Sequence, residues 1–234
     1  MASGPDRAVM ADELVPGIVR PRTPTARAAL EVSTTYCSPA IVNHCLRSYV
    51  WGAAYATQRR IDFDDELLYV AAMLHDIGLV PEFDSHTVPF EDAGGHVAWV
   101  FGAGAGWPEG RRTRAAEVIV RHMRGTELSE DVEGYLLAIA TSLDISGRNP
   151  DWWAEPLRLE VVRRLPRLTL REEFIRCFED QATRKPHSAA SAAVASGIAG
   201  RLAANVLDAP IPPRTDQQSA HGVRSAGAPS ATRR

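Results

Sequence analysis

The sequence contains little cysteine. Its 234 residues include three, Cys37, Cys45 and Cys177, and no two of them have the CxxC spacing. An odd number of scattered cysteines excludes a disulfide framework of the kind that stabilises small secreted domains. We therefore expect reduced thiols that pack as small apolar side chains, with a catalytic cysteine as the alternative.

Long hydrophobic runs and an excess of basic charge are also missing. No apolar run reaches the roughly 18 residues that a membrane-spanning helix needs, so we expect no membrane partner. The 26 lysines and arginines against 29 acids give a net charge of -3, which gives no sign of the basic face typical of nucleic-acid-binding proteins, so we expect no nucleic-acid partner. The first residues carry acids where a signal peptide has basic residues, which predicts a cytoplasmic protein.

The chain shows no clear strand signals. No segment alternates between apolar and polar residues over more than a few positions, and no Asn-Gly hairpin turn occurs. The 45% hydrophobic content is enough for one sizeable core. We predict an all-α, single-domain helical bundle over residues 25–208, with a flexible leader over 1–24 and a disordered tail over 209–234.

Helix signals recur along the predicted domain. Ser38-Pro39 is typical of a helix start, with serine as the N-cap and proline in the first turn. A second helix is expected to begin at the acids of residues 64–66 and to end at Gly78 as its C-cap. Ser129 is predicted to cap a helix over 130–147.

The remaining segments give about seven or eight helices in all. Thr169 and Glu172 have the spacing of a capping box ahead of another helix. Further helices are expected over 90–101, 111–123, 151–165 and 174–184, and an alanine-rich one over 188–207.

Four polar residues interrupt apolar helical segments. They are His44, the adjacent pair His75 and Asp76, and Asp144. Carboxylates are rarely buried unless they are paired or bind a metal, and imidazole with carboxylate suits Zn²⁺, Fe²⁺ or Mn²⁺. If the helix unwinds near Gly78, both His75 and Asp76 can face one ion. Taken singly, each residue is also compatible with an ordinary buried histidine or a capping aspartate.

The order H…HD…D on successive helices resembles the HD superfamily of metal-dependent hydrolases, and His44, His75, Asp76 and Asp144 match its motif. The resemblance is closest to the cyanamide hydratase-like branch and extends over about residues 36–190. The short motifs that carry it are Pro39, Ile41 or Val42, Asn43, His44 and Arg47; Phe90, Glu91, Gly94 and Gly95; Val118-Ile119-Val120-Arg121-His122; and Lys185-Pro186-His187.

The resemblance implies a helical bundle with a divalent metal at its centre, Zn²⁺ or Fe²⁺ first and Mn²⁺ next. It implies a hydratase that adds metal-activated water to a small nitrile-like substrate, such as cyanamide, to give urea. Asp76 would then accept the proton of the water, and His122 would donate to the developing nitrogen anion. Asn43 and Arg47 are candidate contacts to the ligands or the substrate, although Arg47 would also suit a surface ion pair.

Three further residues carry predictions. Glu91 would accept a hydrogen bond from a ligating imidazole, or serve only as an acid at a helix start. His96 would pair with His122 at a second metal, as in the di-iron oxygenases of the superfamily. Lys185 would reach the site or end a helix. We assign no role to His86.

Other functions are compatible with the same residues. HD phosphohydrolases acting on nucleotides or phosphate esters are the main alternative, but many read HDIGK where this chain has Leu79, and no phosphate-binding loop is visible. A di-iron oxygenase and a non-catalytic, metal-stabilised binding module are further alternatives. A small substrate would fit an apolar pocket formed by Tyr49, Trp51, Met73 and Trp99, although the aromatic residues among them are also typical of an ordinary core. A homo-oligomer is possible.

Overall fold

The computed structural model describes residues 11–211 as a bundle of α-helices with one small β-hairpin. The order of the elements is β1 (Glu13–Val15), β2 (Ile18–Val19), α2 (Pro24–Tyr36), α3 (Pro39–Arg59), α4 (Asp65–Leu74), η1 (Ile77–Leu79), α5 (Phe90–Gly104), α6 (Glu109–Arg124), α7 (Val132–Ser146), η2 (Pro150–Trp152), α8 (Glu155–Arg164), α9 (Leu170–Arg184), α10 (Ala189–Ala195), α11 (Ile198–Ala203) and η3 (Val206–Asp208). The prediction of an all-α fold is confirmed.

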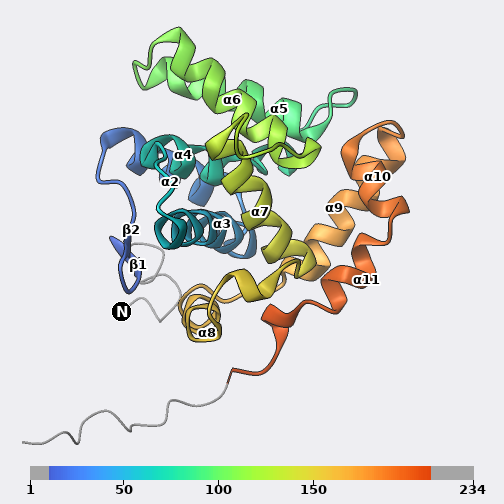
Figure 1. Cartoon of the computed structure of the whole chain (residues 1–234). Helices are drawn as coiled ribbons and strands as arrows, with labels where there is room; N and C mark the ends of the chain where they lie inside the picture. The colour runs from blue at the N-terminus through green and yellow to red at the C-terminus, as the bar shows by residue number, and fades with distance from the viewer. Residues whose placement is uncertain (1–10, 212–234) are drawn as a thin grey trace, which may run out of the picture.

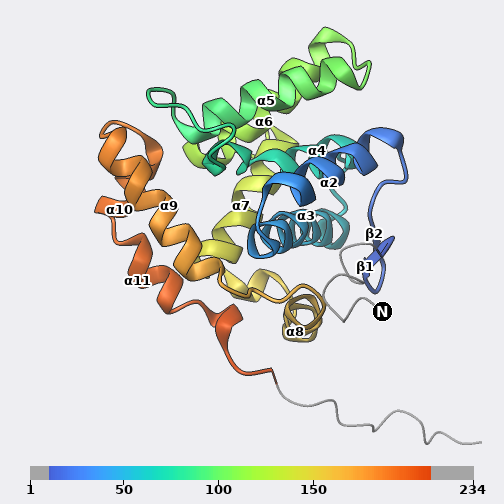
Figure 2. The same cartoon turned by 180° about the vertical axis from the view of Figure 1, so that it is seen from behind.

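Helix α3 lies at the centre of the bundle (Figures 1 and 2). It packs against α2, α4, α7 and α9, and most of its side chains are buried. Helices α5 and α6 form an antiparallel pair on one side, while α9, α10 and α11 pack together on another. The core is continuous across these layers, and it includes the whole apolar face of α4 from Leu67 to Leu74. Burial of this size is the main stabilising term of the fold.

The start of α3 is as predicted. The Ser38 side chain accepts a hydrogen bond from the backbone N–H of Ile41 at 3.3 Å, and Pro39 occupies the first turn. Serine satisfies a donor that would otherwise lack an intrahelical partner, and proline has no N–H to satisfy. The local sequence therefore determines where the helix that carries His44 begins.

The end of α4 differs from the prediction. The helix stops at Leu74, four positions before Gly78, and a 3₁₀ turn follows over Ile77–Leu79. Gly78 is not the C-cap. Its hydrogen atom instead faces α5, where a Cβ would overlap the carbonyl oxygen of Phe90. Glycine is needed here for close backbone packing and not to end a helix.

Other caps also differ. Asp131, and not Ser129, caps α7 by accepting from the Gly134 N–H at 2.7 Å. Thr169 bonds the Glu173 carboxylate and not a backbone N–H, so no capping box forms. The alanine-rich segment is divided into α10, α11 and η3, because Gly197 adopts a left-handed conformation with φ of 80°.

The leader is only partly as expected. Residues 1–10 and 212–234, which include most of the predicted leader and tail, lie outside the described residues. Leu14 and Val15 of β1, however, are buried against the domain, and β1 contacts α3 and α8. The flexible-leader prediction therefore fails for the hairpin over 13–19. Helix α2 was not predicted individually. The domain boundaries at 25 and 208 stay predictions.

Among residues 11–211, no single helix is both long and apolar enough to cross a membrane. The α10 helix and the segment Ile198–Asp208 pass the length and composition test together, as a pair bent by 70°. Both segments pack on α9 in the bundle.

Candidate metal centre

Two neighbouring helices deliver three of the predicted ligands. His44 lies in the second turn of α3, and His75 directly follows the last residue of α4. Asp76 has left the helical conformation, with φ of -100° and ψ of 5°. This local unwinding turns Asp76 to the same side as His75, whereas adjacent residues of a regular helix point about 100° apart. The predicted reason for the adjacent pair is confirmed at the level of the backbone.

The side chains of His44, His75 and Asp76 converge at one buried point. Their candidate ligand atoms all lie within 4.8 Å of one another. The two histidine Nε2 atoms are 3.1 Å apart, and Asp76 Oδ2 lies 3.3 Å from the first and 3.2 Å from the second. Each residue is at most 1% exposed. The chain therefore buries two imidazoles and a carboxylate face to face.

Hydrogen bonds fix which nitrogen of each ring is available. His75 Nδ1 lies 2.7 Å from the carbonyl oxygen of Ala72, so it carries the proton and donates. His44 Nδ1 lies 2.7 Å from Asp144 Oδ2 and donates in the same way. When both rings are neutral, their Nε2 atoms hold lone pairs that point at each other. Metal-binding histidines typically donate their second N–H to a carboxylate or a backbone carbonyl, as both rings do here.

The site fits a cation. Two lone pairs 3.1 Å apart repel each other unless a positive charge lies beside them. Neither carboxylate oxygen of Asp76 has a hydrogen-bond partner in the described chain, although both are buried. A buried carboxylate without a partner is costly, and a metal ion would satisfy it together with the two imidazoles. His44, His75 and Asp76 are therefore suited to hold one divalent ion.

Electrostatics support the same conclusion. Burial opposes ionisation of Asp76, but the neighbouring imidazoles of His75 and His44 outweigh it and hold the pKa of Asp76 below its usual range. Burial likewise opposes protonation of His44, yet the carboxylates of Asp144 and Asp76 raise its pKa. The local field therefore favours positive charge at the point where the three side chains meet.

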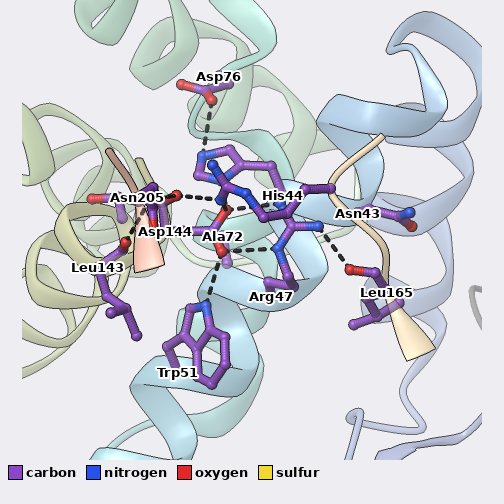
Figure 3. A network of polar contacts seen from close by, with 12 residues as sticks. Asn43, His44, Arg47, Trp51, Ala72, Asp76, Leu143, Asp144, Leu165 and Asn205 are labelled. Atoms are coloured by element: carbon purple, nitrogen blue, oxygen red, sulfur yellow. Dashed lines mark hydrogen bonds and ion pairs between the residues drawn. The ribbon is translucent and has the colours of Figure 1, made fainter. Parts of the chain in front are cut away.

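Asp144 lies beside this group and is held by a different set of donors (Figure 3). Arg47 donates to both of its oxygens, from Nε and Nη2 at 2.8 Å each. Trp51 Nε1 donates to Oδ1 at 3.0 Å, and His44 Nδ1 donates to Oδ2. The structure therefore separates Asp144 from the three converging side chains. As a direct ligand Asp144 remains a prediction; its observed contact is to the back of His44.

Arg47 contacts the predicted ligand Asp144, one of its two predicted roles, whereas neither Asn43 nor Arg47 is among the residues that line the cavity beside His122. Arg47 is fully buried, and its Nη1 donates to the carbonyl oxygen of Leu165 at 2.9 Å. Asn43 donates to the carbonyl oxygen of Pro166 at 2.9 Å and points away from Asp76 in Figure 3. The alternative of a surface ion pair for Arg47 is wrong. Both residues tie α3 to the connection between α8 and α9.

His122 is brought to the site from α6. Its ring centroid lies 5.0 Å from that of His75, and its Nδ1 contacts the carbonyl oxygen of Ile119. Burial and then the neighbouring His75 ring lower the pKa of His122 to about 3, so the ring of His122 is neutral. Because Nδ1 carries the proton, Nε2 is an acceptor, which is the reverse of the predicted donor role in the resting protein.

A cavity of about 160 Å³ connects His122 to the surface. Phe174 and Phe178 of α9 form its apolar wall, and residues of α7, α10 and α11 complete the lining. The predicted apolar pocket is wrong in its members. Tyr49, Trp51 and Met73 are fully buried core residues, and Trp99 is exposed on α5.

Glu91 and His96 do not take the roles predicted for them at the metal centre, and Glu91 matches its alternative as an acid in the first turn of α5. The second ring nitrogens of His44 and His75 bond Asp144 and Ala72, so Glu91 accepts from neither; it is buried at the start of α5 with Oε2 lacking a partner among the described residues. His96 is exposed on α5 while His122 is buried, so the structure does not join them as a second metal site.

Lys185 ends α9 and does not reach the metal centre. Its Nζ donates to Asp84 Oδ1 at 2.9 Å and to Gln181 Oε1 at 2.6 Å. Asp84 belongs to the loop that follows η1, so the ion pair fastens that loop to α9.

The three cysteines behave as expected of reduced thiols. Burial raises the pKa of Cys37 to about 12 and raises those of Cys45 and Cys177. All three are free. A thiolate nucleophile is therefore disfavoured at neutral pH.

Some residues that support the site were not predicted from the sequence. Trp51 donates to Asp144, and Asn205 and Arg167 both donate to its backbone carbonyl. Asn205 and Arg167 come from distant segments, so no local pattern marks them. Trp51 lies one turn beyond Arg47 on α3, a spacing that places both on one helix face.

Comparison with known proteins agrees with this geometry. The HD domain family model matches residues 41–160, which include all four motif residues. The chain belongs to the HD domain family. It is 30% identical over 173 residues to each of two proteins of Saccharomyces cerevisiae, cyanamide hydratase DDI2 and cyanamide hydratase DDI3. Each match covers 71% of this chain and 76% of the yeast protein.

These relatives place the chain in the cyanamide hydratase-like branch of the HD superfamily. The chain is an enzyme of the HD hydrolase and hydratase type. Binding of a divalent metal follows from the family and fits the buried group of His44, His75 and Asp76.

Proposed function

We propose that this protein is a hydratase that adds water across the C≡N bond of cyanamide, or of a nitrile-like molecule of similar size, to give urea or the corresponding amide. The similarity to two yeast cyanamide hydratases supports the reaction. The single structural observation that carries it is the convergence of His44, His75 and Asp76 next to His122 and its small cavity.

The size of the cavity favours a small substrate. Pockets for drug-sized ligands have volumes of about 300–1,000 Å³, whereas this cavity has about 160 Å³. Cyanamide, with three heavy atoms, fits easily, whereas a whole nucleotide would extend out of the cavity into solvent. The size therefore supports the hydratase over the nucleotide phosphohydrolase.

Two imidazoles and one carboxylate suit Zn²⁺ or Fe²⁺ first and Mn²⁺ next. When bound, such an ion lowers the pKa of coordinated water and polarises the nitrile. His44 and His75 offer their Nε2 atoms, and Asp144 and Ala72 hold the two rings in the required orientation. We keep Asp144 as a candidate fourth ligand that would have to leave part of its present hydrogen-bond network.

Asp76 and His122 are the proposed proton carriers. The depressed pKa of Asp76 keeps it ionised, so one of its oxygens can accept a proton from the attacking water. His122 is neutral and presents Nε2 as an acceptor. The proton that Asp76 takes from water can pass through His122 Nε2 to the nitrile nitrogen, and the remaining hydroxyl proton then moves to the same nitrogen to give the amide group of urea. Water and cyanamide together supply every atom of urea, and no redox partner is required.

The test is the formation of urea from cyanamide by the purified chain, measured with elemental analysis of the same samples. We expect turnover that depends on bound metal and that His75→Ala abolishes. His96→Ala is the matched control, because His96 is exposed on α5 and should leave metal content and rate unchanged. Metal-loaded protein that forms no urea from cyanamide, and no amide from small nitriles, would refute the proposal.

Assays of the same samples with other substrates distinguish the alternative functions. Release of phosphate from nucleotides or phosphate esters would favour the phosphohydrolase. Oxygen consumption with iron would favour the oxygenase. Full folding without metal, and no activity lost in Asp76→Ala, would favour a binding module. Cytoplasmic location and self-association stay predictions.

A further inference from the structure

The cavity beside His122 carries positive charge without acidic partners. Two arginines line it, Arg148 after α7 and Arg201 on α11. No aspartate or glutamate is among the described residues that line the cavity. Both arginines therefore line the space beside His122, and no carboxylate among the described lining residues neutralises them there.

The side chains of these arginines have donors to spare. Arg148 is exposed, and its guanidinium forms no hydrogen bond or ion pair within residues 11–211. Arg201 donates to the carbonyl oxygen and the hydroxyl of Ser196, at 2.5 and 3.1 Å, while its buried Nε has no partner in this part of the chain. Many other arginines of the domain, such as Arg111 and Arg184, are paired with carboxylates. A buried donor without an acceptor is unusual and calls for a ligand oxygen.

Hydroxyl groups complete the polar side of the cavity. Ser142 and Ser146 of α7 line it, and neither hydroxyl is engaged by a described residue. Guanidinium N–H groups and serine hydroxyls are together the donors that bind carboxylate and phosphate oxygens. Phe174 and Phe178 add an apolar wall. The cavity thus combines hydrogen-bond donors, apolar rings and His122, which contacts His75 of the metal centre.

We infer that the cavity binds a small oxyanion group between Arg148 and Arg201, so that the preferred substrate carries a carboxylate or phosphate in addition to its reacting centre. The inference rests on the proposed function for the reaction, but the anion subsite stands on the cavity alone. A substrate of this class would place its anionic group near the surface and its electrophilic carbon towards His122. Cyanamide lacks such a group and would occupy only the inner end.

Calorimetric binding of two probes, inorganic phosphate and cyanoacetate, tests the subsite directly. Acetonitrile is the neutral counterpart of cyanoacetate. We expect Arg148→Gln and Arg201→Gln each to weaken binding of both anions at least about tenfold, since each removes charge-assisted hydrogen bonds. Arg148→Lys should restore part of the affinity because it keeps the charge. Arg27→Gln is the matched control: Arg27 is exposed on α2 and contacts only the carbonyl of Arg22.

The same binding measurements on chelator-treated protein distinguish the arginine subsite from the metal. Because oxyanions also bind metal ions directly, the loss of anion binding in the glutamine variants must also be seen in the metal-free protein. Melting temperatures of the variants establish that they fold. The inference is overturned if the glutamine variants are folded and bind phosphate and cyanoacetate as the wild type does, or if cyanoacetate is bound no better than acetonitrile. Loss of anion binding in the variants of a protein that hydrates no cyanamide would uphold the subsite and reject the proposed reaction.

Discussion

Arg47 donates two hydrogen bonds of 2.8 Å to the two carboxylate oxygens of Asp144, and both side chains are completely buried. The carboxylate in turn receives the Nδ1 proton of His44. Arg47 therefore acts on the metal centre through two intermediaries, because it fixes the carboxylate that fixes the imidazole. A planar guanidinium matches both carboxylate oxygens at once, which a lysine ammonium does not.

Arg47→Gln should leave the Asp144 carboxylate buried with its charge uncompensated. We expect a loss of about 3–5 kcal/mol in the free energy of unfolding, because breaking a buried pair costs far more than it gained by forming. Urea-induced unfolding measures it. Arg124→Gln, which removes an exposed pair with Asp92, is the control and should cost less than about 1 kcal/mol. Equal losses in the two variants would contradict the assigned role of Arg47.

Metal content distinguishes direct ligands from their supports. His44→Ala, His75→Ala and Asp76→Ala should each lose the bound metal, because each removes one of three converging donors. Asp144→Asn should instead weaken metal affinity by about 10–100-fold, the usual effect of changing a hydrogen-bond partner of a ligand. Titration with Zn²⁺ and Fe²⁺ measures both effects.

The same titration decides the position of Asp144. Complete loss of metal in Asp144→Asn, equal to that in His75→Ala, would show that Asp144 is a fourth ligand and that its network with Arg47 rearranges when metal binds. His86→Ala and His96→Ala should bind metal like the wild type, since His96 is exposed and His86 lies in the loop after η1.

Gly78 should be intolerant of any side chain. A Cβ at this position would overlap the backbone carbonyl of Phe90, and backbone cannot move as a flexible side chain does. Gly78→Ala should cost about 1–3 kcal/mol or more and should lower metal affinity, because the displaced turn carries Asp76. Gly104→Ala at the other end of α5 meets no atom within 4 Å and should be neutral or stabilising. A stable Gly78→Ala protein with normal metal binding would argue against this packing.

The metal-free protein should lose stability in acid partly through Asp144. Burial alone would raise its pKa, but Arg47 and His44 hold it well below the ordinary value of 3.8. A carboxylate with a depressed folded-state pKa stabilises the fold above its unfolded pKa, and the contribution falls as pH drops below about 3.8 towards the folded value. Unfolding free energies of chelator-treated protein between pH 5 and 2.5 should therefore fall less steeply in Asp144→Asn than in the wild type.

Asp92→Asn is the comparison for this pH series. Asp92 is partly exposed and pairs with Arg124 at the surface, so its replacement should leave the acid slope close to that of the wild type. An Asp144→Asn slope equal to the wild-type slope would mean that other carboxylates, Asp76 among them, govern the acid transition.

The helical class, the start of α3 at Ser38-Pro39 and the pairing of His75 with Asp76 at a helix end could all be predicted from the sequence. Each depends on residues within a few positions of one another, where capping geometry and apolar spacing act locally. Local signals also misled. Gly78 has the composition of a C-cap, yet its role is decided by Phe90, which is close only after α5 packs against η1.

The sequence by itself determined that two imidazoles and two carboxylates lie on apolar helices, and so that a buried polar site had to exist. Only the tertiary structure decided which of them converge. In the folded chain, His44, His75 and Asp76 converge, while Asp144 accepts hydrogen bonds from Arg47 and Trp51. His122 contacts His75, and His96 is exposed away from the site. The physical reason is that ligand geometry depends on how separate helices pack, and residues such as Arg167 and Asn205 enter that packing from segments that no sequence spacing connects to the site.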